Sequence, residues 1–259
     1  MKLTLKYLCG ILAIFFLCSC SKAYAQENSD CFGCHNDLSL KSSQKGKPKS
    51  LFVDGKKFTL SIHGGLTCVS CHADLEGKEL PHDVPLKPVQ CGTCHDKEQN
   101  LYAQCQHGKA ASRGDPLAPH CYDCHGKHDI LAVKDPKSAV APIRVPYVCG
   151  TCHQEGTPVQ KQRQIPQSHI LENYTESIHG EGLLKKGLSV AATCASCHSP
   201  HLILPHTDPR SSINRKNIAQ TCQQCHTQIE AVHRKIIKGE MWEKEANVLP
   251  ACVDCHQPH

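Results

Sequence analysis

The chain has 259 residues, of which 39% are hydrophobic and 5% aromatic, and its formal net charge is +5 at pH 7. So few large apolar side chains exclude an ordinary hydrophobic core for one or two domains, and no Lys/Arg run interleaved with aromatics indicates a nucleic-acid partner. The unusual residues are 20 Cys and 19 His, all potential ligands, against 2 Met and 1 Trp.

The N-terminus reads as a secretory signal peptide over residues 1–25. Two lysines, Lys2 and Lys6, precede an apolar stretch that runs over 7–18, and the small-residue sequence Ala-Tyr-Ala follows at 23–25. A competing interpretation takes residues 17–20 as a lipobox, which would leave a lipid anchor on Cys20. Both predict export to the periplasm or cell surface, and no later segment is apolar for long enough to cross a bilayer.

From residue 31 onward the pattern Cys-x-x-Cys-His occurs eight times. The cysteines are Cys31, Cys34, Cys68, Cys71, Cys91, Cys94, Cys121, Cys124, Cys149, Cys152, Cys194, Cys197, Cys222, Cys225, Cys252 and Cys255. The histidines that follow them are His35, His72, His95, His125, His153, His198, His226 and His256. Two thiols on one helical turn reach the two vinyl groups of one haem, and the next imidazole binds its iron. The spacing predicts eight covalently attached c-type haems.

Cys-x-x-Cys pairs also occur in zinc sites and in thioredoxin-like redox pairs. A zinc site does not require a histidine directly after the second cysteine, whereas all eight motifs have one, which favours haem. In the mature chain only Cys105 stands outside the motifs. It occupies a slot that holds Ser61 and Ser177 in related segments, so we predict a small packed residue rather than a disulfide or redox group.

The motifs form an internal repeat of two-haem units within one haem-binding domain over 26–259. The units span about 31–72, 91–128, 149–201 and 222–259. The second and fourth units share one template. Cys94 to His107 is 13 residues and His107 to Cys121 is 14, and Lys238 divides the stretch from Cys225 to Cys252 in the same way.

Histidines outside the motifs recur at equivalent positions, which predicts sixth ligands for the irons, because low-spin electron-transfer haems commonly take a second imidazole. Three stand in a His-Gly dipeptide between the motifs of a unit: His63, His107 and His179. Three follow a motif histidine by three residues: His128, His201 and His259. His82 and His206 share a Leu-Pro-His setting and are further candidates for one or both remaining ligands.

In the fourth unit Lys238-Gly239 replaces His-Gly. One alternative is an open or Lys-ligated iron, where nitrite or hydroxylamine chemistry would occur. The other, which we favour, is that His233 supplies the sixth ligand, since a protonated lysine, with an ordinary pKa near 10.4, cannot coordinate a metal.

Haems would supply the missing core, so the predicted fold is a multihaem cytochrome c with few short α-helices and a mostly irregular chain wrapped around a haem array. Two stretches look more regular, 168–186 and 227–246, because apolar residues recur there at helical intervals. Pro-containing segments, over 134–146 and 205–210, connect the units.

The repeated CxxCH motifs, SxHG segments, CHxxH endings and DPxS linkers resemble the multihaem cytochromes of the cytochrome c3 and related superfamily, including periplasmic decahaem conduits of metal-reducing bacteria. The resemblance spans nearly the whole mature chain. It implies a periplasmic or cell-surface electron carrier of anaerobic respiration, with bis-His haems in a close-packed chain. The eight-haem count, Lys238 and the end at His259 depart from the family, and the last raises the alternative of a truncated chain.

The leading hypothesis is an electron conduit from a membrane quinol dehydrogenase or periplasmic donor to a terminal reductase, another multihaem cytochrome or an outer-membrane acceptor. With every iron six-coordinate, the protein would be a carrier and not an enzyme. The first rival is a nitrite- or hydroxylamine-type reductase, for which Lys238, Arg234 and His233 form the nominated cluster. The second rival is a structural subunit, either a plug in an outer-membrane porin or a filament protomer.

Overall fold

The computed structural model describes residues 26–42, 48–82, 86–163, 165, 167–228, 251–257 and 259. These residues form short helices and irregular chain, and the described ranges contain no β-strand beyond one isolated bridge between Lys41 and Ser50. The helical elements are α1 Asn28–His35, α2 Gly55–Leu60, α3 Cys68–Cys71, η1 Ala73–Leu75, η2 Cys91–Thr93, α4 Asp96–Gln104, α5 Gln106–Ser112, α6 Cys121–His125, η3 Pro142–Arg144, α7 Val145–His153, α8 Pro158–Gln162, α9 Ile170–Glu176, α10 Ile178–Gly180, η4 Glu181–Lys185, α11 Cys194–His198, α12 Ile218–Gln223 and α14 Cys252–Cys255.

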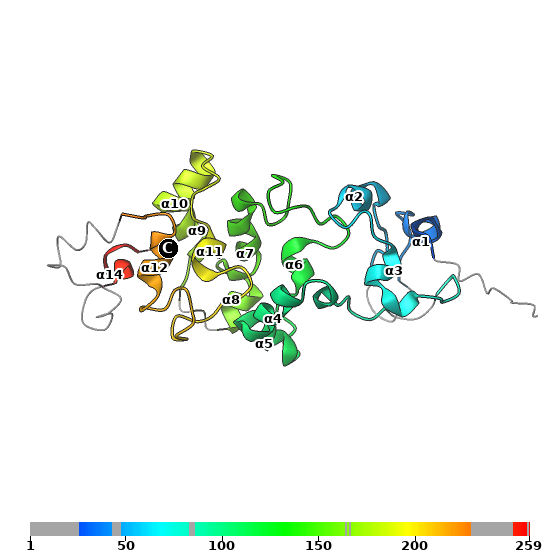
Figure 1. The fold of residues 1–259 in the computed structure, drawn as a ribbon, viewed down its shortest axis with the longest axis horizontal. Coiled ribbons are helices and arrows are strands. Elements are labelled where there is room, and N and C mark those ends of the chain that lie inside the picture. Colours follow the sequence, from blue (N-terminus) through cyan, green and yellow to red (C-terminus); the bar gives the residue numbers. More distant parts are fainter. Residues whose placement is uncertain are drawn as a thin grey trace, which may run out of the picture.

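The molecule is elongated, and its helices follow one another broadly in chain order along the longest axis (Figure 1). The blue and cyan elements α1 to α3 lie at one end, and the orange and red elements α12 and α14 lie at the other. The short helices and the irregular chain between them confirm the predicted fold of low regularity. No helix in the described ranges combines the length and apolar character needed to span a bilayer.

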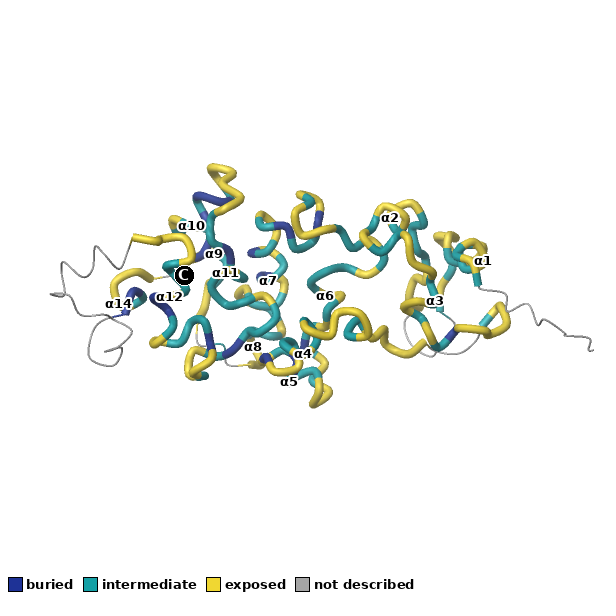
Figure 2. The backbone as a smooth tube through the Cα atoms, in the orientation of Figure 1, coloured by how far each residue is buried: buried dark blue, intermediate teal, exposed yellow. Residues whose placement is uncertain are grey.

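Buried side chains are few and scattered, as the short dark-blue stretches in Figure 2 show. Among the described residues, Leu183 and Cys105 are each 1% exposed, and Tyr174 is the one buried aromatic residue. Large apolar side chains such as Val190 remain 84% exposed. Because folding is driven mainly by apolar burial, so small a core does not by itself hold the described part of the chain together.

Two helix pairs repeat the same break. Helix α4 ends at Gln104 and α5 begins at Gln106, while α9 and α10 flank Ser177, so the predicted regular stretch over 168–186 is interrupted at this serine. Cys105 and Ser177 both adopt extended backbone and cap the second helix, since their Sγ and Oγ atoms accept from the N–H groups of Gly108 at 3.4 Å and Gly180 at 3.1 Å. Cys105 therefore performs the capping role of a serine.

The glycine of each His-Gly dipeptide lies against the backbone of the preceding helix. A Cβ atom added at Gly64, Gly108 or Gly180 would meet a carbonyl oxygen at 2.2, 1.9 or 2.0 Å, respectively. A side chain is therefore excluded at this position. The dipeptide recurs because only glycine permits the sharp helix break that presents the neighbouring histidine.

A tyrosine hydroxyl ties each of the two helix pairs to the chain before the next motif. Tyr102 donates to the carbonyl of Pro119 at 2.7 Å, and Tyr174 donates to the carbonyl of Ala192 at 2.9 Å. Both tyrosines stand five residues before a His-Gly histidine, and both acceptors stand two residues before a motif. Phe58 holds this position in the first unit.

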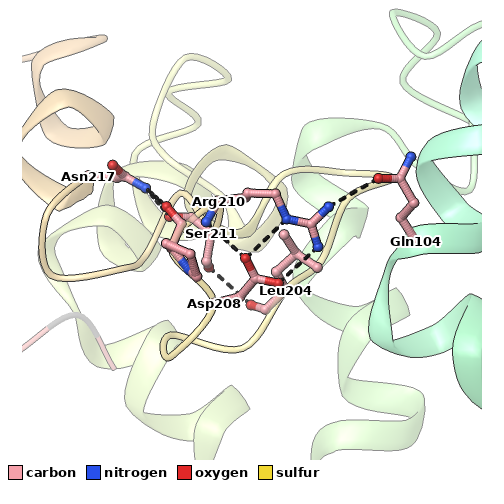
Figure 3. A network of polar contacts seen from close by, with 7 residues as sticks. Gln104, Leu204, Asp208, Arg210, Ser211 and Asn217 are labelled. Carbon is pink, nitrogen blue, oxygen red and sulfur yellow. Dashed lines mark hydrogen bonds and ion pairs between the residues drawn. The ribbon is translucent and has the colours of Figure 1, made fainter.

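The predicted linkers form repeated Asp-Pro-x-Ser turns. Ser138 and Ser211, each 2% exposed, donate to the carbonyl oxygens of Leu131 and Leu204. In the second turn Arg210 donates to the Asp208 carboxylate at 2.9 Å and to the Gln104 amide oxygen at 3.1 Å (Figure 3). This network fastens the linker, which follows the third unit, to α4 of the second unit.

Candidate haem-binding site

All eight motifs lie on helical turns. Six lie on α1, α3, α6, α7, α11 and α14, the motif at Cys91 lies on η2, and the motif at Cys222 begins at the end of α12. Residues three apart on a helix share one face, so the two thiols of each motif project to the same side. No disulfide joins the cysteines that the structure describes.

Within each unit the first cysteine of one motif contacts the first cysteine of the other. The contacts join Cys31 to Cys68, Cys91 to Cys121, Cys149 to Cys194, and Cys222 to Cys252. Burial and the neighbouring Cys31 raise the pKa of Cys68 to about 11, whereas the hydrogen bond from Cys252 lowers the pKa of Cys222 to about 7. The four units inferred from sequence thus correspond to four contacting pairs of motifs.

Cysteines also approach one another between units. Cys71 lies near the thiols of the motif at Cys91, Cys124 lies near Cys152, and Cys197 lies near the motif at Cys222. Every motif therefore neighbours the next in the sequence. The eight form one continuous row, consistent with the chain-ordered arrangement in Figure 1.

Seven motif histidines each face one histidine from outside the motifs. The pairs are His35 with His82, His72 with His128, His95 with His63, His125 with His201, His153 with His107, His198 with His259, and His226 with His179. All seven partners belong to the set that the sequence nominated as sixth ligands.

The ring separation is nearly constant while the ring orientation is not. Centroids lie 5.9 to 6.2 Å apart, whereas interplanar angles range from 16° to 68°. Two imidazoles on opposite sides of one metal, each with a metal–nitrogen bond of about 2 Å, have centroids about 6 Å apart and can rotate about the bond axis. By contrast, His120 and Tyr122 make a direct stack, with centroids 5.2 Å apart and an interplanar angle of 3°.

Burial lowers the pKa of eight of the paired imidazoles and so favours the neutral form that metal ligation requires. These are His72, His107, His125, His128, His153, His179, His198 and His259. Burial lowers the pKa of His107 to about 4, with a smaller contribution from His153, whose own pKa is also lowered by burial. The Nδ1 atoms of His72, His82 and His259 are buried without a hydrogen-bond partner. Such groups are costly to leave in a core, so these rings fit a site built to hold a bound group.

Nδ1 of His35 lies 2.7 Å from the carbonyl oxygen of Leu51. Donation of a proton from Nδ1 to this carbonyl leaves the lone pair of Nε2 available to a metal. The ring of His82 faces the same imidazole.

Two candidate ligands are not brought into such pairs within the described chain, and a third lies outside it. His206 is exposed and faces no other imidazole in the described chain, although its Leu-Pro-His setting matches that of His82. His256 is exposed and has no ring partner among the described residues. His233 lies outside the described residues, as do Arg234, Lys238 and the predicted regular stretch beyond residue 228.

Some functional detail was not apparent from sequence patterns. The assignment of each outside histidine to one motif depends on contacts between units. The tyrosine hydroxyl bonds of Tyr102 and Tyr174 were also missed, although the fixed five-residue spacing to the following His-Gly dipeptide was a usable signal.

No group of three or more His, Cys, Asp or Glu side chains in the described ranges is arranged to enclose a metal ion by itself. The recurring arrangement at each paired motif is instead two facing imidazoles beside two cysteine thiols. No protein-family model matches the chain, and no solved structure matches it.

Proposed function

We propose that the chain is an exported octahaem c-type cytochrome that relays electrons. The observation that carries this proposal is the set of seven imidazole pairs, whose separation stays at 5.9 to 6.2 Å while their angles vary. Each pair holds one histidine from a CxxCH motif. A shared metal explains a fixed distance with free rotation, whereas direct ring contact does not.

The residues divide into two roles. The paired cysteines would hold each haem covalently, and the two facing imidazoles would bind its iron. The chemistry supplied at each site, once the haem is bound, is one-electron oxidation and reduction of iron. The imidazole pairs would keep seven irons low-spin and closed to substrate, which favours relay over catalysis.

The continuous row of motifs supports a conduit running along the long axis. Consecutive attachment thiols contact one another within units and approach one another between units. Neighbouring haems anchored on them would be close in the same order. The donor would be a quinol dehydrogenase or another redox protein, and the acceptor a multihaem cytochrome, a terminal reductase or an outer-membrane partner such as a porin-held complex. The signal-like N-terminus supports a periplasmic or cell-surface place for this activity.

Mass spectrometry and optical spectroscopy of protein produced in an exporting host with intact cytochrome maturation test the proposal. We expect the polypeptide mass plus eight haems, a Soret band, and predominantly low-spin signals in electron paramagnetic resonance of the oxidised protein. A mass matching bare polypeptide would overturn it. A fully loaded protein dominated by high-spin iron would instead support the reductase alternative.

A further inference from the structure

The facing histidines do not belong to the same unit. At the first junction, His63 of unit 31–72 faces His95 of unit 91–128. In the opposite direction, His128 of the second unit faces His72 of the first. Each unit thus presents an imidazole to a motif of its neighbour.

The same reciprocal arrangement recurs at the other two junctions. His107 faces His153 in the next unit, and His201 faces His125 in the preceding one. Likewise, His179 faces His226 and His259 faces His198. In every case the His-Gly histidine points forward to a first motif, and the CHxxH histidine points back to a second motif.

At two junctions a backbone hydrogen bond joins the segment that carries the His-Gly histidine to the segment that carries the CHxxH histidine. The N–H of Ile62, directly before His63, donates to the carbonyl of Ile130 at 2.9 Å, two residues after His128. The N–H of Gln106, directly before His107, donates to the carbonyl of Ile203 at 3.0 Å. The second acceptor again stands two residues after a CHxxH histidine. Equivalent positions make equivalent hydrogen bonds at both junctions, so the reciprocal facing of histidines is a repeated feature of the fold.

The first unit shows how the pattern is adapted where a motif has no preceding neighbour. Leu75, which is 8% exposed, stands three residues after His72, where a CHxxH histidine would point back. The first motif receives its facing imidazole from His82, in the connector after the unit. In the first unit the apolar residue Leu75 thus stands at the position from which a CHxxH histidine faces a motif of the preceding unit.

We propose that neighbouring two-haem units exchange their sixth iron ligands, with each His-Gly imidazole binding the first iron of the next unit and each CHxxH imidazole binding the second iron of the preceding unit. This inference rests on the proposed haem binding. Six bonds between imidazole and iron would therefore cross the three junctions, two at each. Separating two units would open one iron on each side, so the electron path across a junction would depend on the docking of both units.

The rule also bears on Lys238, which stands at the His-Gly position of the fourth unit. The three described histidines at that position each face the first motif of the next unit and not the second motif of their own. Lys238 itself lies outside the described residues, and the rule predicts that Lys238→Ala leaves the number of carbon monoxide sites unchanged.

The test combines removal of a ligand with removal of a haem in the full chain. His107→Ala should open one iron, giving a new high-spin ferric signal and about one additional equivalent of bound carbon monoxide in the reduced protein. Adding Cys149→Ser and Cys152→Ser should remove one haem by mass and abolish that new site. Adding Cys91→Ser and Cys94→Ser should remove one haem and leave the His107 site in place.

The reverse direction gives an independent check. The site opened by His201→Ala should disappear with Cys121→Ser and Cys124→Ser, and should survive loss of the cysteines at 194 and 197. His120→Ala, which removes an imidazole that stacks on Tyr122, is the matched control and should open no iron. Haem counting by mass separates the two proposals, because absence of haem contradicts the function itself. The exchange would be overturned if the parent protein carried eight haems but the site opened by His107→Ala or His201→Ala disappeared on removal of a haem from the same unit as the substituted histidine.

Discussion

The backbone N–H of Gln106 donates to the carbonyl of Ile203 at 3.0 Å and so joins the second two-motif unit to the third. Gln106 is the first residue of α5 and follows the extended residue Cys105. It immediately precedes His107, whose ring faces His153 across the same junction. One main-chain bond thus fixes the place from which the His107 imidazole reaches across the junction.

Gln106→Pro removes this donor with little other disturbance, because proline is tolerated at the first helical position after an extended residue. Loss of one hydrogen bond should increase the fraction of time that the irons at the junction are open by roughly fivefold to tenfold. The measurement is the rate of carbon monoxide binding to the reduced protein. Ile178→Pro occupies the equivalent place in α10, where the described chain shows no backbone acceptor for this N–H, and should leave the rate unchanged.

Gly64 and Gly65 provide a matched pair for the close approach at the His-Gly dipeptide. A Cβ at Gly64 would lie 2.2 Å from the carbonyl oxygen of Thr59, whereas a Cβ at Gly65 meets nothing within 4 Å. Gly64→Ala should therefore destabilise the protein by about 1–3 kcal/mol and displace His63 from its pair, while Gly65→Ala should change stability by less than about 0.5 kcal/mol. Denaturant unfolding followed by circular dichroism measures the difference. Equal effects of the two substitutions would contradict the close backbone approach.

Tyr102→Phe and Tyr174→Phe should each lower the free energy of unfolding by about 1 kcal/mol, since each removes a hydroxyl donor from a backbone carbonyl. Burial raises the pKa of both phenols to about 12, so the donors stay protonated over the ordinary pH range. Tyr122→Phe is the control, because Tyr122 is 40% exposed. Phe58→Tyr tests whether the first unit can gain the same bond.

Cys105→Ser should keep stability and haem content unchanged, because serine performs the same capping at position 177. Cys105→Ala should cost about 1 kcal/mol, since the N–H of Gly108 loses its capping acceptor. Thermal unfolding and intact mass provide the two readouts. A change in haem number with Cys105→Ser would show that this thiol takes part in attachment.

The Asp208 turn should stabilise the protein in a pH-dependent way. Hydrogen bonds from Arg210 lower the pKa of Asp208 to about 2, below its ordinary value of 3.8. A carboxylate with a depressed pKa contributes stability that is full above pH 3.8 and is lost as the pH falls through about 2. The difference in unfolding free energy between the protein and Asp208→Asn should therefore be constant near neutral pH and shrink over that acidic window. In an Arg210→Gln background, replacing Asp208 should produce a much smaller pH-dependent difference.

The sequence by itself determined the local chemistry. Eight CxxCH motifs, their grouping into four units and the recurring outside histidines are all spacing patterns, and one helical turn suffices to align two thiols. The irregular helical fold followed from the scarcity of large apolar residues. The His-Gly glycine was also visible as a pattern, although its cause, the carbonyl oxygen of the preceding helix, was not.

Only the tertiary structure decided which imidazole faces which motif. His82 and His206 have the same Leu-Pro-His setting, yet only His82 is paired in the described chain. The reason is that pairing depends on how units dock, through bonds such as that between Gln106 and Ile203, nearly a hundred residues apart. Local spacing identifies a candidate histidine within one unit, whereas the motif that this histidine faces across a junction depends on a long-range contact that no local pattern records.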